Sequence, residues 1–363
     1  MRYRPLATIL TLASLFVDFA TAQSVKQVAP VPGDQFELVT GPAIIAETPE
    51  KRSTILALLE RARQNNSLHI NGTRPFALKV TFSANGASAY AGAGDLEEDW
   101  ISNSVWKWTS HLGTYSQSRI FHDGVAFDSN PHAYLPMRLQ MIRQAIFWPI
   151  SGNFSNDMIR FAEATWNGKH VTCALIAGPR AEANNQSGRQ WNEEEFCIDS
   201  VSGLLQTYST APGIYTVYDY SNALLFHGRT LARHITIVEN STTAAEVQLN
   251  DIQDLNSTDP NLFLPGPELQ GPGVMIGAPI RFPQIVKKDS ALGGVGVVQP
   301  VIIHAALDMT GKVLEAEALQ SPESLLSQAA IRLVKNTNYG ATRGAVPLQR
   351  DVFINVQFVS AQR

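Results

Sequence analysis

The sequence predicts an α+β protein of two domains, in which a large curved antiparallel β-sheet of the half-open barrel type precedes a small two-layer α/β module. Hydrophobic residues make up 44% of the 363 residues and charged residues only 17%, which supplies apolar side chains for sizeable cores. About ten short strand-like runs, mostly joined by hairpin signals, occupy residues 76–252. After a stretch rich in proline and glycine, residues 296–363 follow the order strand, strand, helix, strand.

The first 22 residues have the features of an export signal. Arg2 and Arg4 precede an apolar run over residues 6–17, and residues 20–22 form a small-x-small cleavage pattern. The run is too short to cross a membrane as a helix. We expect cleavage before Gln23 and a mature protein in the periplasm or cell envelope. The alternative is an uncleaved segment that anchors the chain in the inner membrane.

Two helices are expected in the large domain, over residues 48–62 and 135–147. Thr48 is a suitable N-cap and Pro49 suits the first helical position. Apolar residues then recur at helical spacing in both segments. The second helix is expected to stop before Pro149, because proline cannot continue the hydrogen-bond pattern.

The other elements expected in residues 30–257 are strands. Apolar and polar residues alternate over residues 76–83, which is the period of a half-buried strand. Asn167-Gly168 is the strongest hairpin signal and joins strands expected over residues 160–166 and 169–176. Further strands are expected over residues 96–101, 105–109, 115–121, 125–127, 195–198, 204–209, 215–220, 230–239 and 245–252. This set predicts one large antiparallel sheet that curls around helices.

Two cysteines lie within this predicted sheet. If residues 169–176 and 195–198 form a hairpin centred near Asn185, Cys173 and Cys197 face each other. An exported protein allows a structural disulfide between them. The alternative is two buried free thiols, and the absence of C-x-x-C spacing argues against a redox role.

Residues 258–295 are expected to form a semi-extended linker, because prolines and glycines recur there without periodicity. The elements expected in residues 296–363 are strands over residues 301–307, 312–319 and 351–359 and a helix over residues 321–334. Ser321 and Pro322 provide the N-cap and first position of that helix.

The run from Val301 to Val313, the helical residues 326–334, Tyr339 and the turn over residues 344–347 resemble the C-terminal domain of the TonB family of energy transducers. The resemblance implies a non-enzymatic envelope protein that docks a partner, such as an outer-membrane receptor peptide, along an edge strand. The residues expected to form that edge strand are Val352, Phe353, Ile354, Asn355, Val356, Gln357 and Phe358. Transducers of this family carry a long Pro/Lys-rich rod, which this sequence lacks. A membrane-anchored energy transducer is therefore the alternative function and not the leading one.

Residues 199–205, with an Asp-x-x-x-Gly turn, are similar to the turn between two central strands of Lol-type periplasmic lipoprotein carriers. This resemblance implies a curved half-open barrel lidded by helices, with an apolar cavity. The β domain would then bind a partner, an apolar ligand or a lipid. A periplasmic lipid or lipoprotein carrier is the second alternative function.

The sequence contains no G-x-S-x-G, H-E-x-x-H, Walker or C-x-x-C motif. We therefore expect no catalytic residues, no metal site and no cofactor. The formal net charge of −4 argues against nucleic acid as a partner. Membrane contact is expected only if the N-terminal segment stays uncleaved.

Overall fold

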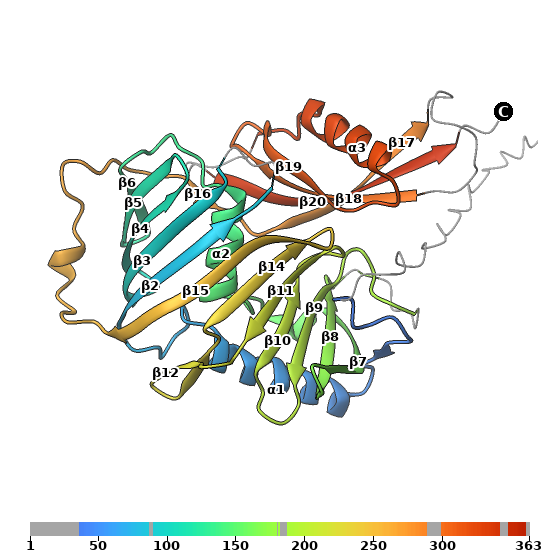
Figure 1. Ribbon diagram of the computed structural model, residues 1–363, viewed down its shortest axis with the longest axis horizontal. Helices are drawn as coiled ribbons and strands as arrows, with labels where there is room; N and C mark the ends of the chain where they lie inside the picture. The colour runs from blue at the N-terminus through green and yellow to red at the C-terminus, as the bar shows by residue number, and fades with distance from the viewer. Residues whose placement is uncertain are drawn as a thin grey trace, which may run out of the picture.

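The computed structural model describes residues 36–86, 90–179, 181, 187–288, 299–341 and 348–360. The expected export signal, the expected hairpin centre near Asn185 and the expected turn over residues 344–347 lie outside the described residues. Figure 1 shows a large curved sheet with helices α1 and α2 against it, and a smaller sheet carrying helix α3.

The large sheet has 13 antiparallel strands in the order β1-β7-β8-β9-β10-β11-β14-β15-β2-β3-β4-β5-β6. Its strands are β1 Ile44–Ile45, β2 Phe76–Ala84, β3 Gly92–Ser102, β4 Val105–Leu112, β5 Tyr115–His122, β6 Val125–Asp128, β7 Met158–Trp166, β8 Lys169–Ala177, β9 Glu194–Asp199, β10 Leu205–Ser209, β11 Ile214–Asp219, β14 His234–Glu239 and β15 Thr242–Asp254. The predicted large curved antiparallel sheet is confirmed. The strand expected over residues 230–239 is instead two, because β13 (Arg229–Leu231) leaves the sheet to pair with β12 (Leu224–Phe226).

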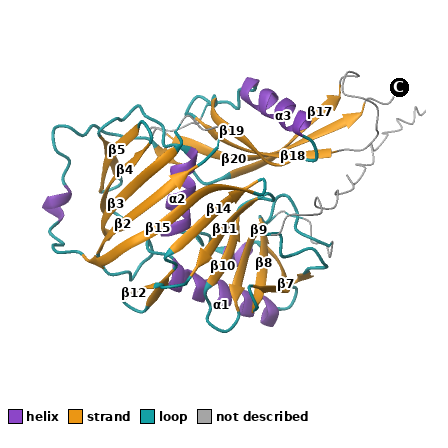
Figure 2. Ribbon diagram, viewed as in Figure 1, coloured by secondary structure: helices purple, strands orange, loops and turns teal. Residues whose placement is uncertain are grey.

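Helices α1 (Pro49–Asn66) and α2 (Met137–Phe147) confirm the two predicted helices. The Thr48 side chain accepts a hydrogen bond from the backbone N–H of Lys51, as expected of an N-cap. Every residue of α2 except Gln144 is buried, and the helix lies behind the sheet in Figure 2. A helix that is buried all round belongs to the protein core. In the described residues, α2 is therefore part of the core that packs against the large sheet.

The C-terminal module is a second sheet covered by helix α3 (Ser324–Asn336). Its strands are β16 Met275–Ile276, β17 Ile280–Lys288, β18 Gln299–Leu307, β19 Val313–Gln320 and β20 Leu348–Ser360. The predicted order of strand, strand, helix and strand over residues 296–363 is confirmed by β18, β19, α3 and β20. The sheet order is β16-β20-β18-β19, with β17 also paired to β20.

The expectation that residues 352–358 form a free edge is wrong. They lie in β20, which pairs with β18 on one side and in parallel with β17 on the other. The physical reason is that β17 occupies the second side of β20. Residues 258–295, which include β17, were expected to form a semi-extended linker, and that expectation is wrong for residues 280–288. Pro283 made this segment resemble a linker, yet proline is tolerated in a strand at the rim of a sheet.

Both faces of this second sheet are covered. Val352, Ile354 and Val356 face α3 and belong to the core of the module. Phe353, between them in sequence, belongs to the core of the large domain. The alternation that predicted one buried face therefore describes a strand whose other face is buried as well.

The amino terminus of α2 depends on this second sheet. Its N-cap position is Pro136, which makes no side-chain cap, and no acidic residue occupies its first turn. Instead, the backbone N–H of Met137 donates to Glu315 Oε1 at 3.1 Å, and the N–H of Leu135 donates to Gln349 Oε1 at 3.0 Å. Strand β19 thus provides an acceptor for the first N–H of the helix, and β20 holds the residue that precedes the N-cap.

The segment between the two sheets also covers the edge of the large one. The backbone N–H of Asp128 in β6 donates to the carbonyl of Gln270 at 2.8 Å, and the N–H of Gln270 donates back at 2.9 Å. Phe263, in the short 3₁₀ turn Pro260–Phe263, is buried, with Lys107 of β4 over its ring. A covered edge strand does not pair with other chains.

Cys173 of β8 lies opposite Cys197 of β9 in the strand register, and a disulfide joins them. Both residues are fully buried. We predict that a Cys173→Ala/Cys197→Ala double variant loses about 3 kcal/mol of unfolding free energy, because its unfolded chain is no longer cross-linked. Denaturant unfolding of both proteins measures this difference. A reducing agent should remove the difference, and equal stabilities under oxidising conditions would contradict the prediction.

Candidate functional site

Buried charged side chains form several clusters in the described residues, and these clusters differ in whether a cleft opens onto them. A charged group is costly to bury unless it is paired. A cluster whose groups are all satisfied internally acts as structure. One that lines a cleft and keeps unused hydrogen-bonding capacity is a candidate site.

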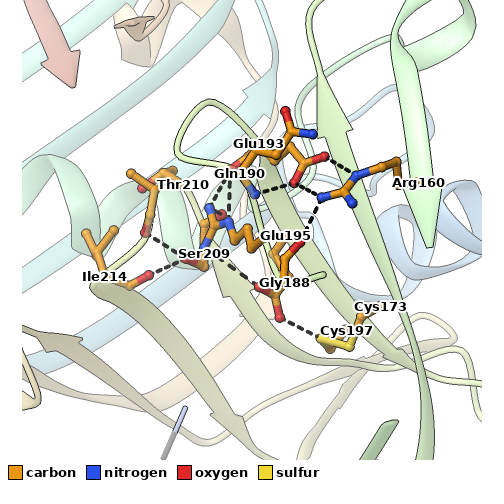
Figure 3. Close-up of polar contacts among 12 residues, drawn as sticks. Arg160, Cys173, Gly188, Gln190, Glu193, Glu195, Cys197, Ser209, Thr210 and Ile214 are labelled. Atoms are coloured by element: carbon orange, nitrogen blue, oxygen red, sulfur yellow. Dashed lines mark hydrogen bonds and ion pairs between the residues drawn. A yellow bond between two sulfur atoms is a disulfide. The ribbon is translucent and has the colours of Figure 1, made fainter. Parts of the chain in front are cut away.

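The cluster beside the disulfide is structural (Figure 3). Arg160 of β7 donates to both carboxylate oxygens of Glu193 at 2.7 Å and to the carbonyl of Gly188 at 2.9 Å. The backbone N–H of Gln190 donates to Glu193 at 2.7 Å. Arg160 and Glu193 are each 1% exposed. This bidentate pair ties the segment before β9 to β7 and leaves its own oxygens occupied.

A second cluster lies between α2 and strands β3 and β4. Arg143 of α2 contacts Glu98 of β3 at 2.7 Å, and Glu98 also pairs with His69. The Arg143 guanidinium lies 5.0 Å from the Trp108 ring centre. Burial lowers the pKa of His69 more than the neighbouring Glu98 raises it. None of the clefts described below opens onto this cluster, in which Glu98 and Arg143 are buried.

The third cluster bridges the two sheets. Arg138 of α2 donates to Glu239 at the end of β14 and to Glu317 of β19. Behind this pair, His304 of β18 pairs with Asp351 of β20, and its Nδ1 lies 3.6 Å from Glu239 Oε1. Three carboxylates therefore surround two cationic groups.

The pKa values in this bridging cluster are strongly displaced. Burial acts to lower the pKa of His304, but Asp351 and Glu239 outweigh it and raise that pKa to about 10. Burial raises the pKa of Glu317 to about 7. The neighbouring Glu239 adds repulsion in the same direction, and the attraction of Arg138 does not cancel the two effects. For Glu239, burial is outweighed by His304 and Arg138, which lower its pKa to about 2. Glu317 is consequently the carboxyl group of this cluster that titrates near neutral pH.

A cleft of about 670 Å³ opens onto this cluster. Its lining is Asn85, Gly86, Arg138, Glu239, Asn240, Thr242, Thr243, Ala244, Ala316, Glu317, Ala318, Ser321, Pro322, Glu323, Ser324, Ser327, Gln328 and Ile331. A Cβ at Gly86 would lie 2.7 Å from Arg138 Nη2, and its φ of +119° also requires glycine. The backbone at Gly86 therefore approaches the Arg138–Glu317 pair closely.

The walls of the cleft come from the C-terminal module and from the large domain. One side is α3, and the other is the turn between β14 and β15. Between them lie three consecutive residues of β19, Ala316, Glu317 and Ala318. In the described residues β19 is the end strand of its sheet and pairs with β18 alone. The cleft thus follows an unpaired strand edge.

The expected docking residues 352–358 do not line this cleft, because β20 is two strands away from β19. Sequence reasoning missed Arg138, Glu239 and Glu317. Arg138 is separated from them by 101 and 179 residues, and no motif links the three positions. The order of β18, β19 and β20 was predicted, but it does not by itself say which strand is left at the edge.

A second cleft, of about 470 Å³, lies between α1 and residues 150–155. Its apolar lining includes Leu56, Leu59, Ile150 and Phe154, and Arg63 lies among its polar residues. None of the helices in the described part of the chain is long and apolar enough to span a membrane.

The displaced pKa of His304 predicts a pH dependence of stability. A pKa raised from 6.5 to about 10 on folding contributes stability that is present below pH 6.5 and lost as the pH rises through 10. We predict that the unfolding free energy falls between pH 7 and pH 9 by up to about 1.4 kcal/mol per pH unit. Denaturant unfolding of the wild type and a His304→Gln variant measures this slope. The variant should lack the His304 contribution, and parallel profiles for the two proteins would contradict it.

No protein-family model matches this chain, and no characterised protein matches it by sequence. The TonB resemblance of residues 296–363 therefore gains no support.

Solved structures do match. The LolA-superfamily protein NE2245 from Nitrosomonas europaea has 8% identity and a TM-score of 0.40, over 58% of this chain and 97% of that one. LprF from Mycobacterium bovis has 8% identity and a TM-score of 0.24, over 60% and 97%. MucB has 14% identity and a TM-score of 0.26, over 60% and 65%. At these values each is a similarity and establishes no family.

Proposed function

We propose that this chain is a non-enzymatic, exported binding protein that takes up an extended segment of a partner protein along the free edge of β19. One observation carries the proposal: Ala316, Glu317 and Ala318 follow one another along the cleft between the two sheets. An unpaired strand edge has backbone groups that pair readily with an incoming strand. The docking strand is therefore β19 in place of the β20 residues expected from the sequence.

The residues that line the cleft fit this mode of binding. Strand addition uses backbone hydrogen bonds for affinity and side-chain pockets on alternate sides for selectivity. Ser324, Ser327, Gln328 and Ile331 of α3 line one wall at helical spacing, so one face of the helix follows the groove. Thr242 and Thr243 lie on the opposite wall. An added strand would have one row of side chains toward α3 and the other toward the large sheet.

The buried disulfide supports the location of this function. Structural disulfides persist in oxidising compartments such as the periplasm. The expected export signal over residues 1–22 is consistent with that compartment. A membrane-anchored transducer would instead keep this segment uncleaved, and it would bind its partner in the same cleft along β19 (the β19 groove).

We predict that random seven-residue peptides displayed on phage are enriched on the full chain and that Ser327→Trp weakens their binding at least about tenfold. Ser327 lines the groove, so a tryptophan there fills the space of the added strand. Leu325→Trp is the matched control, because Leu325 is on the same helix, is 66% exposed and lies outside the lining. Enriched peptides that bind both variants equally, or no enrichment at all, would overturn the proposal.

A lipid or lipoprotein carrier is the second candidate function. It is favoured by the second cleft, between α1 and residues 150–155, which we call the α1 groove. This groove combines apolar Leu56, Leu59 and Phe154 with the charged Glu60 and Arg63 at its side, which suits a ligand with an apolar chain and a polar head.

For the carrier, we predict saturable binding of a fluorescent hexadecanoic acid analogue that Leu56→Arg abolishes, because the charge enters the apolar wall. Ala57→Arg is the control, since Ala57 is exposed on the same helix and outside the groove. Fluorescence titration measures both affinities. Absence of binding, or equal affinity for both variants, would exclude the α1 groove as a lipid site.

A further inference from the structure

The charged side chains that line the cleft along β19 are unequal in number. Glu239, Glu317 and Glu323 line the cleft with a single guanidinium, that of Arg138. Arg138 already pairs with two of these carboxylates. Behind them, His304 is paired with Asp351 and contributes no net charge to the cleft. The lining therefore has an excess of negative charge.

Two carboxylate oxygens in the cluster have unused capacity. Glu239 is 4% exposed, and its Oε1 has only a long contact to a cation among the described residues, with His304 Nδ1 at 3.6 Å. Glu317 Oε1 is likewise buried without a hydrogen-bond donor among the described residues. A buried acceptor without a donor is costly, and a donor brought by a ligand removes that cost.

The strand register says where such a donor would come from. Glu317 points toward Arg138 and the large sheet, whereas Ala316 and Ala318 pack into the core beneath α3. In an antiparallel or parallel pair, directly opposed side chains lie on the same face, about 5 Å apart. A residue added opposite Glu317 would therefore have its side chain beside this carboxylate, and its two neighbours would face α3.

We propose that the groove selects an extended partner segment with a lysine or arginine side chain opposite Glu317, flanked by small or aliphatic residues that face α3. This inference rests on the proposed function and specifies the chemistry of the partner. A cationic side chain supplies the missing donors and balances the excess carboxylate charge. On the α3 side the wall includes Ser324, Ser327 and Ile331, whose small or aliphatic side chains suit small or aliphatic neighbours.

Binding of a cation at Glu317 would be coupled to a proton. The groups facing Glu317 are Arg138 from α2 and Glu239 from β14, with His304 and Asp351 behind Glu239. The pKa of free Glu317 is about 7, and an added cation would lower it toward its ordinary value. Protonation competes with the cation, so affinity should be roughly 10- to 100-fold higher at pH 8 than at pH 5.

The test uses the full chain and peptides selected from the same phage library. We expect a basic residue at one position of the selected sequences, with small or aliphatic neighbours. Replacing that residue by glutamine in a synthetic peptide should weaken binding to the wild type about tenfold and should have little effect on binding to Glu317→Gln. Glu317→Gln keeps the shape of the side chain and should fold, because a carboxyl with a raised pKa gains little from being charged.

Calorimetric titration of the basic peptide at pH 6.5, in buffers of different ionisation enthalpy, should show release of up to one proton that Glu317→Gln eliminates. If selected peptides are blocked by Ser327→Trp but show no basic preference, or keep it in Glu317→Gln, this inference is overturned and strand docking stands. If selected peptides are insensitive to Ser327→Trp, strand docking itself fails.

Discussion

The start of helix α2 is the point on which the arrangement of this protein depends. A buried helix start has backbone N–H groups that need acceptors, and α2 has neither a capping side chain nor an acidic first turn of its own. Glu315 of the second sheet accepts from the first of these N–H groups, that of Met137, and Gln349 accepts from the N–H of Leu135 just before the N-cap. Hydrogen bonds are directional, so this contact sets the position of the second sheet and does more than hold it nearby. Separating the two sheets would leave groups on both sides unsatisfied.

This docking explains why β19 is the edge available for binding. The second sheet has one face against α3 and the other against the large domain, so neither face is free for a ligand. Strand β17 pairs with β20, and Arg281 of β17 donates to Glu194 and to the carbonyl of Thr210 in the large domain. These hydrogen bonds join the β17 side of the second sheet to the large domain. The β19 side ends in a cleft.

The bridging cluster, which comprises Arg138, Glu239, Glu317, His304 and Asp351, consists of buried ion pairs, and such pairs lose much of their attraction to desolvation. Its value lies in specificity of position, because each cation has partners on both sheets or on adjacent strands. The same arrangement leaves one carboxylate in excess at the floor of the cleft. Docking of the sheets and selection of a partner would then use the same side chains.

Elements whose signals are local could be predicted from the sequence. The cap at Thr48, the two-residue period of β2, the Asn167-Gly168 hairpin and the strand, strand, helix, strand order of residues 296–363 are all read within a few neighbouring residues. The facing of Cys173 and Cys197 also follows from local pairing, since β8 and β9 are adjacent along the chain and in the sheet.

The position of the cleft and the identity of the free strand could not be predicted, because both depend on contacts between distant segments. β17 pairs with residues about 70 positions later in a parallel register, and Pro283 hides its strand character. The partners of Arg138 lie on strands 101 and 179 residues away. A strand's place at an edge or in the interior depends on what else packs beside it, and no periodicity within the strand records that. Local patterns specify elements, whereas contacts between distant segments specify the site.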